Sequence, residues 1–451
     1  MDAVAAGRAR LTGAQALRLM REAPLHDLGR WASAAADRLH GQKIRTYVID
    51  RNVNYTNVCS ARCTFCAFYR KLGDDEGYVL SRDELHGKFA ELSDIGGTQV
   101  LMQGGMHPEL PIEFYEEMLS GLKGAFPHIH LHAFSPPEFV EFVAVFDVDG
   151  FPSTEPRKSG EMPREQWLGK LEAIMRRLQA AGLDSVPGGG AEIFAEPVRR
   201  RIGRGKASAD QWLDVMRTAH RLGMSTSATM MFGHIEGAAD RIDHMQRVRD
   251  AQDEAIEQGW PGRYVSFITW PFQPDHTALG RMPEWDGESG EPFPGDVLAE
   301  GGEHGDAGKV LRRAGATEYL RMQAVARLFL DNVHSIGSSW VTMGPKIGQL
   351  GLFFGANDMG SVMMEENVVS AAGTTHQLDE AMICRLIRDA GYVPAQRDNE
   401  YRHLKVHEGE GPDTAVTDWS AGRQRESAFG AGEVGAEVTV GDGAGVDGDG
   451  G

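Results

Sequence analysis

The chain has 451 residues, of which 41% are hydrophobic and 8% aromatic, enough to bury the core of one large domain or of two ordinary ones. Its net charge of -19 argues against a general nucleic-acid-binding protein, because phosphate contacts need clustered Lys and Arg. The N-terminus resembles no signal peptide, and no run approaches the roughly 18 apolar residues that span a membrane. We therefore expect a cytoplasmic protein with neither nucleic acid nor a membrane as partner.

The first part of the chain has the period of amphipathic helices. Residues 1–45, and 17–41 most clearly, carry apolar side chains at helical spacing, which predicts an N-terminal helical extension that caps the remaining fold. Binding of a partner by this extension is the less favoured alternative.

Residues 46–404 alternate between short β-prone runs and stretches of helical periodicity, as in a parallel sheet wrapped by helices. The expected strands are 52–58, 98–105, 129–135, 183–189, 225–233, 264–270, 338–344 and 351–358. The expected helices are 81–96, 111–126, 164–182, 209–223, 241–259, 317–332 and 375–391. This pattern predicts an α/β fold, namely a (β/α)8 TIM-type barrel. A doubly wound open sheet is the alternative arrangement.

Two acidic, glycine-rich segments carry too little apolar surface to offset the entropy of ordering them. Residues 284–308 interrupt the predicted barrel, and residues 405–451 end the chain. The first is predicted to be a disordered surface insertion and the second a disordered tail.

Three of the four cysteines lie within eight positions, at Cys59, Cys63 and Cys66. So few cysteines, so crowded, do not make a disulfide framework, and they point to a metal or a cluster in a reducing compartment. Three thiolates hold three irons of a cubane cluster and leave one iron open for a ligand, whereas ferredoxin-type clusters use four cysteines. Structural zinc is the alternative, and it needs a fourth ligand such as Cys384 or a histidine. Cys384 lies on the apolar stripe of a predicted helix, where a cysteine is usually a small buried hydrophobe.

The spacing Cys-x3-Cys-x2-Cys, with an aromatic residue before the third cysteine, resembles that of the radical S-adenosylmethionine (SAM) enzymes. The resemblance implies that Cys59, Cys63 and Cys66 hold a 4Fe-4S cluster whose open iron binds SAM, and that Phe65 packs near the adenine. Other residues after the predicted strands then gain a role. The turn Gln103, Gly104 and Gly105 would admit the methionyl group to the backbone, with a simple tight turn as the alternative. Glu192 would contact the ribose or the methionyl group, with a surface carboxylate at a helix start as the alternative.

A closer resemblance covers residues 25–401. It rests on "NYTNVCSARCTFCAFYR", "QGGMHPELPIEFY", "HAFSPPE", "GGGAEI", "MMFGHIE" and "GANDMGSVMMEENVVSAAG", which together resemble the dehypoxanthine futalosine cyclases of menaquinone biosynthesis. The resemblance implies dehypoxanthine futalosine as substrate and an external electron donor of the flavodoxin or ferredoxin kind. It also implies a 5'-deoxyadenosyl radical that takes hydrogen from ribose C4', followed by radical attack on the benzoate ring. Aminofutalosine synthase, the deazaflavin-forming synthase and, from another class, an iron-sulfur electron-transfer protein are the alternatives.

Such a reaction needs a base and a partner for the benzoate carboxylate. Four titratable groups after predicted strands are candidates for the base: His234, Glu236, Asp275 and His276. The structural alternative for His234 is a hydrogen-bonded core or rim histidine, and that for Asp275 is a helix or turn cap. Further residues placed near the substrate by position are Glu365, Glu366, Asn367 and the cations Arg62, Arg70 and Lys346.

Overall fold

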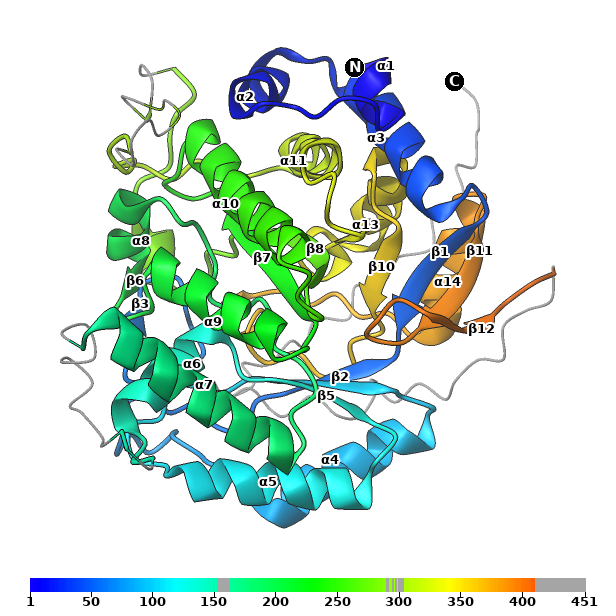
Figure 1. Ribbon diagram of the computed structural model, residues 1–451. Coiled ribbons are helices and arrows are strands. Elements are labelled where there is room, and N and C mark those ends of the chain that lie inside the picture. The colour runs from blue at the N-terminus through cyan, green and yellow to red at the C-terminus, as the bar shows by residue number, and fades with distance from the viewer. Residues whose placement is uncertain are drawn as a thin grey trace, which may run out of the picture.

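The computed structural model describes residues 1–148, 150–151, 162–288, 292–293, 296, 298 and 304–409. Within these residues the chain has an α/β fold with a mainly parallel sheet (Figure 1). None of the described helices is both long and apolar enough to cross a membrane.

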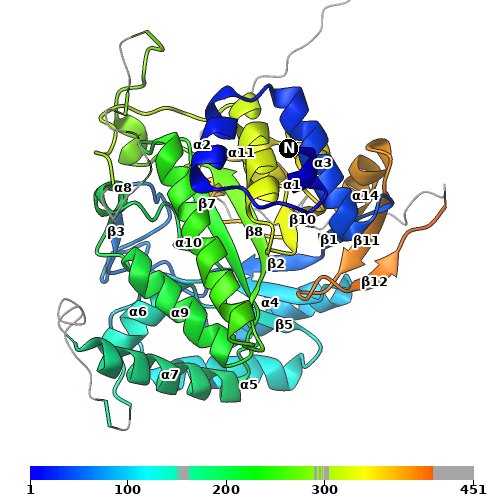
Figure 2. The same ribbon diagram turned by 45° about the horizontal axis from the view of Figure 1, so that its top comes forward.

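The N-terminal segment forms three helices: α1 (Asp2–Ala5), α2 (Gly13–Glu22) and α3 (Leu25–His40). A capping box between Thr12 and Gln15 begins α2. Helix α2 packs on α10 and α11, and α3 packs on α11. Figures 1 and 2 show α2 and α3 lying beside α11. Arg10 adds ion pairs to Asp253 and Asp331. The extension is therefore fastened to the body of the protein by both apolar and charged contacts.

The strands form two larger sheets. One has the order β12-β11-β1-β10-β9-β8-β7 and the other β2-β4-β5; every pairing in them is parallel except that of β11 with β12. The bounds are β1 (Ile44–Val48), β2 (Asp50–Val53), β4 (Gln99–Met102), β5 (His130–Ala133), β7 (Thr226–Phe232), β8 (Tyr264–Pro271), β9 (Ser335–Gly337), β10 (Asp358–Ser361), β11 (Val393–Arg397) and β12 (His403–Val406). A small antiparallel pair joins β3 (Arg62–Cys63) to β6 (Gly203–Arg204).

Two short contacts link the larger sheets. Only Ile49 separates β1 from β2, and isolated parallel bridges pair His132 with Ser185 and Val186 with Thr226. The predicted strand at 183–189 is thus reduced to these two bridges.

The remaining helices lie outside the strands, as Figures 1 and 2 show for α4, α5, α7, α9 and α10. Their bounds are α4 (Arg82–Asp94), α5 (Ile112–Ala125), α6 (Pro136–Val145), α7 (Arg164–Ala181), α8 (Glu196–Ile202), α9 (Ala209–Arg221), α10 (Ala238–Glu257), α11 (Ala316–Phe329), α12 (Trp340–Met343), α13 (Pro345–Gly351) and α14 (Glu380–Asp389). Seven of these correspond to predicted helices. The capping box expected at Ser81 and Glu84 begins α4.

Two predicted strands were wrong. Residues 338–344 contain helix α12, and the strand of that region is β9, just before it. Residues 351–358 contain the short 3-10 helix η3 (Leu352–Phe354), and strand β10 begins only at Asp358. Trp340 and Leu352 are buried in these helical turns. The apolar residues around them therefore pack against other elements and do not form a strand.

The acidic segment 284–308 and the tail 405–451 lie partly outside the described residues. Inside the segment, Phe293 is buried, and Asp296 accepts hydrogen bonds from the backbone of Ala238 and Ala239 at the start of α10. At the other end, β12 extends two residues beyond the predicted barrel boundary at 404. The predicted disorder of the positions outside the described residues stays a prediction.

Candidate active site

A cavity of about 460 Å³ lies among the strands of both larger sheets. The eight residues that were expected from the sequence to hold a cluster and SAM all line it: Cys59, Cys63, Phe65, Cys66, Gln103, Gly104, Gly105 and Glu192. They come from the segments after β2, after β4 and before α8. These motifs were expected from the sequence to lie close together, and the structure places these eight residues around one cavity.

The cysteine loop is held by backbone hydrogen bonds on several sides. Strand β3, which contains Cys63, pairs with β6, and the N–H of Thr64 donates to the carbonyl of Ile202 at 2.8 Å. The N–H of Met106 donates to Sγ of Cys59 at 3.3 Å. Burial raises the pKa of the Cys59 thiol to about 11 and that of Cys63 to about 12. Both thiols are therefore neutral unless a bound metal ion removes the proton.

The arrangement of the thiols fits a cluster better than a single metal ion. Within the described residues, no three His, Cys, Asp or Glu side chains surround one point as a zinc ion requires. In an iron-sulfur cluster each thiolate binds a different iron, so the sulfurs need not converge. Cys384 lies in α14, where its side chain interacts with Tyr47, and it does not line the cavity.

Glycines bring the backbone against the cavity. A Cβ on Gly104 would lie 2.5 Å from the ring of Tyr55, and one on Gly105 would lie 2.1 Å from the carbonyl oxygen of Val58. A Cβ on Gly189 would lie 2.1 Å from the side-chain nitrogen of Gln103. Only glycine leaves room for these close approaches, so the turn at 103–105 lies flat on the segment that leads into the cysteines.

Glu138, which was not among the site residues predicted from the sequence, joins the ends of three strands. One carboxylate oxygen accepts from the hydroxyl of Tyr55 at 2.7 Å and from the N–H of Gly104 at 3.0 Å. The other accepts from the N–H and hydroxyl of Ser135 at 2.7 Å each. Burial raises the pKa of Glu138 to about 7 although these donors oppose the shift. The pattern Ser135-x2-Glu138 is a capping box that the sequence did contain.

Lys206 is a second cavity residue that the sequence analysis missed. Its Nζ forms an ion pair with Glu192 and lies 4.9 Å from the centroid of the Phe65 ring, a cation–π contact. Glu192 itself has a left-handed backbone with φ of 42°, a conformation that is costly for a non-glycine residue. The charged pair therefore sits on a constrained backbone beside the cysteine loop.

The four predicted candidates for the base lie outside the cavity lining. His234 and Glu236 are both buried. Burial disfavours the charge of Glu236, but His234 and Arg241 outweigh it and hold the pKa of this carboxyl below its usual value. The carboxylate also accepts from the N–H of Gly233 at 2.6 Å and from Nε of Arg241 at 2.8 Å. This group fixes the turn between β7 and α10 and does not reach the cavity.

Asp275 and His276 lie exposed in a turn after β8. Among the other candidates, Arg62 and Lys346 are exposed and Arg70 pairs with Glu76, and none of the three cations lines the cavity. The reason is that loops after parallel strands turn outward within a few residues, which periodicity does not reveal.

The segment after β10 covers part of the cavity. Glu365 points away from the cavity and forms ion pairs with Arg51 at 2.8 Å and Lys88 at 2.6 Å. Glu366 lines the cavity and accepts from the N–H groups of Val369 and Ser370 at 2.7 Å each. The lining also includes aromatic and apolar side chains, here called the aromatic part of the cavity: Phe68, Tyr69, Trp270, Trp340, Val341, Met363, Val368 and Val369. Among the methionines, Met230 and Met231 are core residues, whereas Met106 and Met363 line the cavity.

Comparisons with known proteins agree with this geometry. Residues 53–248 match the model of the radical SAM superfamily, and residues 306–409 match the CofH/MqnC C-terminal region. Cyclic dehypoxanthine futalosine synthase of Halalkalibacterium halodurans is 39% identical over 88% of this chain and 93% of its own. The chain belongs to the radical SAM superfamily. It is therefore a radical SAM enzyme, and its cofactors are a 4Fe-4S cluster and SAM.

Other relatives of this radical SAM enzyme carry related names. Cyclic dehypoxanthine futalosine synthase of Streptomyces coelicolor is 39% identical over 90% of this chain and 89% of its own. Aminodeoxyfutalosine synthase of Thermus thermophilus is 35% identical over 88% of this chain and 93% of its own. Among solved structures, methylornithine synthase (PylB) has a TM-score of 0.58 at 16% identity and covers 88% of this chain and 97% of its own. That likeness concerns the fold alone.

Proposed function

We propose that this radical SAM enzyme cyclises dehypoxanthine futalosine to cyclic dehypoxanthine futalosine in menaquinone biosynthesis. The observation that carries the proposal is the 39% identity, over about nine-tenths of the chain, to two relatives that bear the name of this synthase. The aminodeoxyfutalosine synthase relative is 35% identical. A cavity with an aromatic part and a polar part also suits a substrate made of an aryl half and a sugar half.

The residues of the cavity have distinct tasks in this proposal. Cys59, Cys63 and Cys66 hold the cluster, and the glycine turn at 103–105 and Glu192 contact SAM. When bound, these cofactors supply a 5'-deoxyadenosyl radical that takes the hydrogen atom from ribose C4'. The substrate radical would then add to the benzoate ring, and the ring would regain aromaticity by giving one electron to the oxidised 4Fe-4S cluster and one proton to a basic side chain. The protein must hold the two halves of the substrate together and exclude water from the radical.

Glu366 is our candidate for the group that accepts the ring proton. It lines the aromatic part of the cavity, and burial raises the pKa of its carboxyl, which favours a base near neutral pH. Backbone donors from Val368, Val369 and Ser370 hold the carboxylate in place. This proposal replaces His234, Glu236, Asp275 and His276, none of which lines the cavity.

A closed (β/α)8 barrel is the arrangement that we propose for the strands around this cavity. The supporting pairings run in one circle: β2 with β4, β4 with β5, β5 with Ser185, Val186 with β7, then β8, β9, β10 and β1. Because only Ile49 separates β1 from β2, the circle returns to its first strand. The cysteines, the glycine turn and Glu366 then lie at the C-terminal ends of strands, where barrel enzymes place their sites.

We further propose that a flavodoxin-like or ferredoxin-like protein supplies the electron and that the enzyme works in the cytoplasm. The reducing cytoplasm keeps the cysteines available for the cluster.

The test is anaerobic reconstitution with iron and sulfide, then incubation with dithionite, SAM and dehypoxanthine futalosine deuterated at C4'. We expect deuterated 5'-deoxyadenosine together with a product that is two hydrogens lighter and has one new ring. Unlabelled 5'-deoxyadenosine without that product would refute the substrate assignment, and turnover of the aminodeoxyfutalosine synthase substrate instead would favour that activity. Glu366→Gln should still release deuterium into 5'-deoxyadenosine but form less cyclised product; equal losses of both would refute its role as the base.

A further inference from the structure

The part of the cavity that is lined mainly by the strands themselves, and not by the loops after them, is unusually polar. Ten residues line it, here called the polar chamber: Asp50, Asn52, Gln99, His132, Ser227, Ser266, Asp358, Arg397, Asn399 and Tyr401. They come from β2, β4, β5, β7, β8 and β10 and from the segment that includes the end of β11. The inner positions of a parallel sheet are normally apolar. Ten polar side chains there require a reason other than folding.

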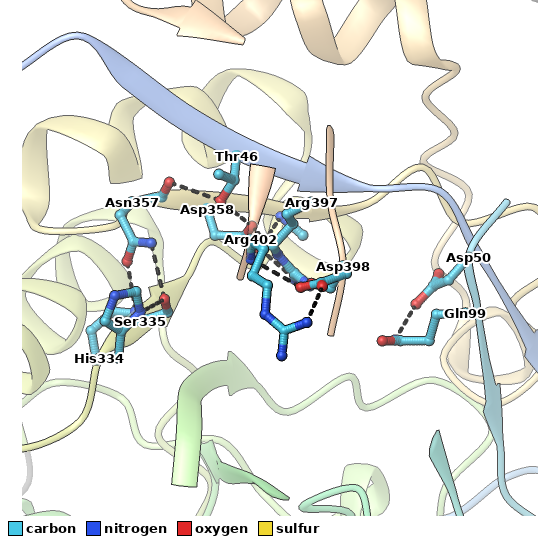
Figure 3. Close-up of polar contacts among 12 residues, drawn as sticks. Thr46, Asp50, Gln99, His334, Ser335, Asn357, Asp358, Arg397, Asp398 and Arg402 are labelled. Atoms are coloured by element: carbon cyan, nitrogen blue, oxygen red, sulfur yellow. Dashed lines mark hydrogen bonds and ion pairs between the residues drawn. The ribbon is translucent and has the colours of Figure 1, made fainter. Parts of the chain in front are cut away.

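The charges of the polar chamber are nearly balanced, with an acidic remainder. Arg397 binds Asp358 through two hydrogen bonds, of 2.6 Å and 3.0 Å (Figure 3). Burial lowers the pKa of His132 well below its usual value, so its ring is neutral. Asp50 accepts from Nε2 of Gln99 at 3.1 Å and from the hydroxyl of Ser361, and no ion pair joins it to a cation within the described residues. The polar chamber therefore offers no unpaired cation to a carboxylate.

Three side-chain amides of the polar chamber each have one polar atom without a hydrogen-bond partner in the described part of the chain. These atoms are Oδ1 of Asn52, Oε1 of Gln99 and Nδ2 of Asn399. These residues are only 7%, 6% and 7% exposed. In Figure 3, Gln99 extends away from Asp50 with its oxygen at the free end. A buried polar atom without a partner destabilises the protein, so three around one cavity mark a place where a ligand completes the hydrogen bonds.

The chemical class of the ligand follows from this set of donors and acceptors. Hydroxyl groups both donate and accept, so they can donate to the oxygens of Asn52, Gln99 and Asp50 and accept from Nδ2 of Asn399. A carboxylate only accepts, and it would face the oxygens of these groups with no free cation nearby. An uncharged polyhydroxylated group fits, and an anionic group does not.

We propose that the polar chamber binds the hydroxyl groups of the substrate's pentose, with Gln99, Asn52 and Asn399 as the residues that recognise them. The inference rests on the proposed function, because dehypoxanthine futalosine has a free pentose at one end and a benzoate at the other. The sugar then points into the polar chamber, and the aryl half lies along the aromatic part of the cavity beside Glu366. Gln99 and Asn399 therefore determine which end of the substrate enters first.

The experiment measures binding by calorimetry to the reconstituted enzyme with SAM and without reductant, so that no turnover occurs. The two probes are dehypoxanthine futalosine and its 2',3'-dideoxy analogue. The wild type should bind the natural sugar about tenfold more tightly or better, because the analogue leaves buried amides without partners. In Gln99→Met and in Asn399→Leu, which keep the shape but lose the amide, this preference should fall several-fold. Gln246→Met, in a surface pair with Asp250, should keep the wild-type preference.

The outcomes separate this inference from the proposed function. If the wild type binds neither probe, the proposed function fails and the inference fails with it. If the wild type binds the natural substrate but both polar-chamber variants keep the full preference for the hydroxylated sugar, the inference alone is overturned. Iron content and melting temperature identify a variant that does not fold, and the other variant then decides.

Discussion

Glu138 is the residue whose protonation is most directly tied to the geometry of the site. Its carboxyl is 1% exposed, and burial raises its pKa from 4.5 to about 7. The folded state therefore binds this proton more tightly than the unfolded chain does. This contribution to stability is complete below pH 4.5 and is lost as the pH rises through about 7.

We therefore expect the stability advantage of the wild type over Glu138→Gln to shrink with rising pH. The difference in free energy of unfolding should fall by about 1–3 kcal/mol between about pH 5 and pH 8. Urea unfolding followed by circular dichroism measures it. Glu117→Gln, at an exposed position of α5, serves as the control and should show no such trend. A constant difference for Glu138→Gln would mean that its carboxyl is ionised throughout this range.

The three clustered cysteines give a second prediction at this scale. Cys59→Ala, Cys63→Ala and Cys66→Ala should each lose the cluster and the activity, because the remaining two thiolates leave two irons without protein ligands. Iron analysis and visible absorbance after anaerobic reconstitution measure this loss. Cys384→Ala, in the core of α14, should keep its iron. Full iron content in any of the first three variants contradicts the ligand assignment.

Residues of the site were predictable where a local motif marked them. The three cysteines marked by their spacing, the glycine turn at 103–105 and Glu192 all line the cavity. Lys206 and Gln99 carried no such mark, because their position in the site depends on which strands become neighbours. His234 and Glu236 also looked like site residues, but in the fold Glu236 pairs with both His234 and Arg241.

At the scale of elements, the turn after β4 connects the glycines to the cysteine loop. A Cβ on Gly105 would meet the backbone oxygen of Val58 at 2.1 Å and Cβ of Cys59 at 3.0 Å. The backbone of Val58 cannot move away from the added Cβ without shifting the adjacent Cys59. We expect Gly105→Ala to lower stability by about 1–3 kcal/mol and to reduce iron incorporation.

The matched control for this substitution is Gly121→Ala in α5. Its Cβ would be 3.7 Å from the side chain of Arg82, an ordinary contact, and alanine is favoured over glycine inside a helix. Melting temperature and iron content should stay equal to those of the wild type or rise slightly. If Gly105→Ala also behaves in this way, the turn is not as rigid as its contacts imply.

The positions of helices were predictable from the sequence when one face of the helix is exposed to solvent and the other is buried. Helices α4, α7 and α9 show this, with apolar and polar faces at helical spacing. Helix α6 was missed because nearly all its residues are buried, so its sequence shows no periodicity. The first strand was placed eight residues late, because the segment from Ile44 carries Arg45 and Arg51, whose charges are paired with Asp37 and Glu365.

For the whole molecule, the end of the chain divides into a part that builds the fold and a part that we predict the fold does not need. Strand β11 pairs with β1, and Arg397, Asn399 and Tyr401 line the polar chamber. The acidic, glycine-rich residues after Gly411 have too little apolar content for a packed element.

We expect a chain that ends at Gly411 to keep nearly full activity and an unchanged melting temperature. A chain that ends at Gly391 lacks β11 and three residues of the polar chamber, namely Arg397, Asn399 and Tyr401. It should therefore lose cooperative unfolding. Activity and calorimetric melting curves measure both. A large loss of activity in the longer truncation would give the tail a function.

The class of the fold followed from the alternation of strands and helices, but the order of strands did not. Ile44 and Val393 are partners in the sheet, and nothing local to either residue selects the other. Such pairings depend on the packing of the complete molecule.

The position of β1 also fixes the order in which the protein can be completed. Both of its neighbours, β10 and β11, belong to the last quarter of the chain, whereas the three cysteines leave the ribosome early. At about 5–20 residues per second, roughly 20 to 60 seconds of synthesis separate Cys66 from Arg397. During that interval β1 lacks both of its neighbouring strands, so the cavity around the thiols is incomplete and the nascent chain is exposed to oxidants and to iron-sulfur carriers alike.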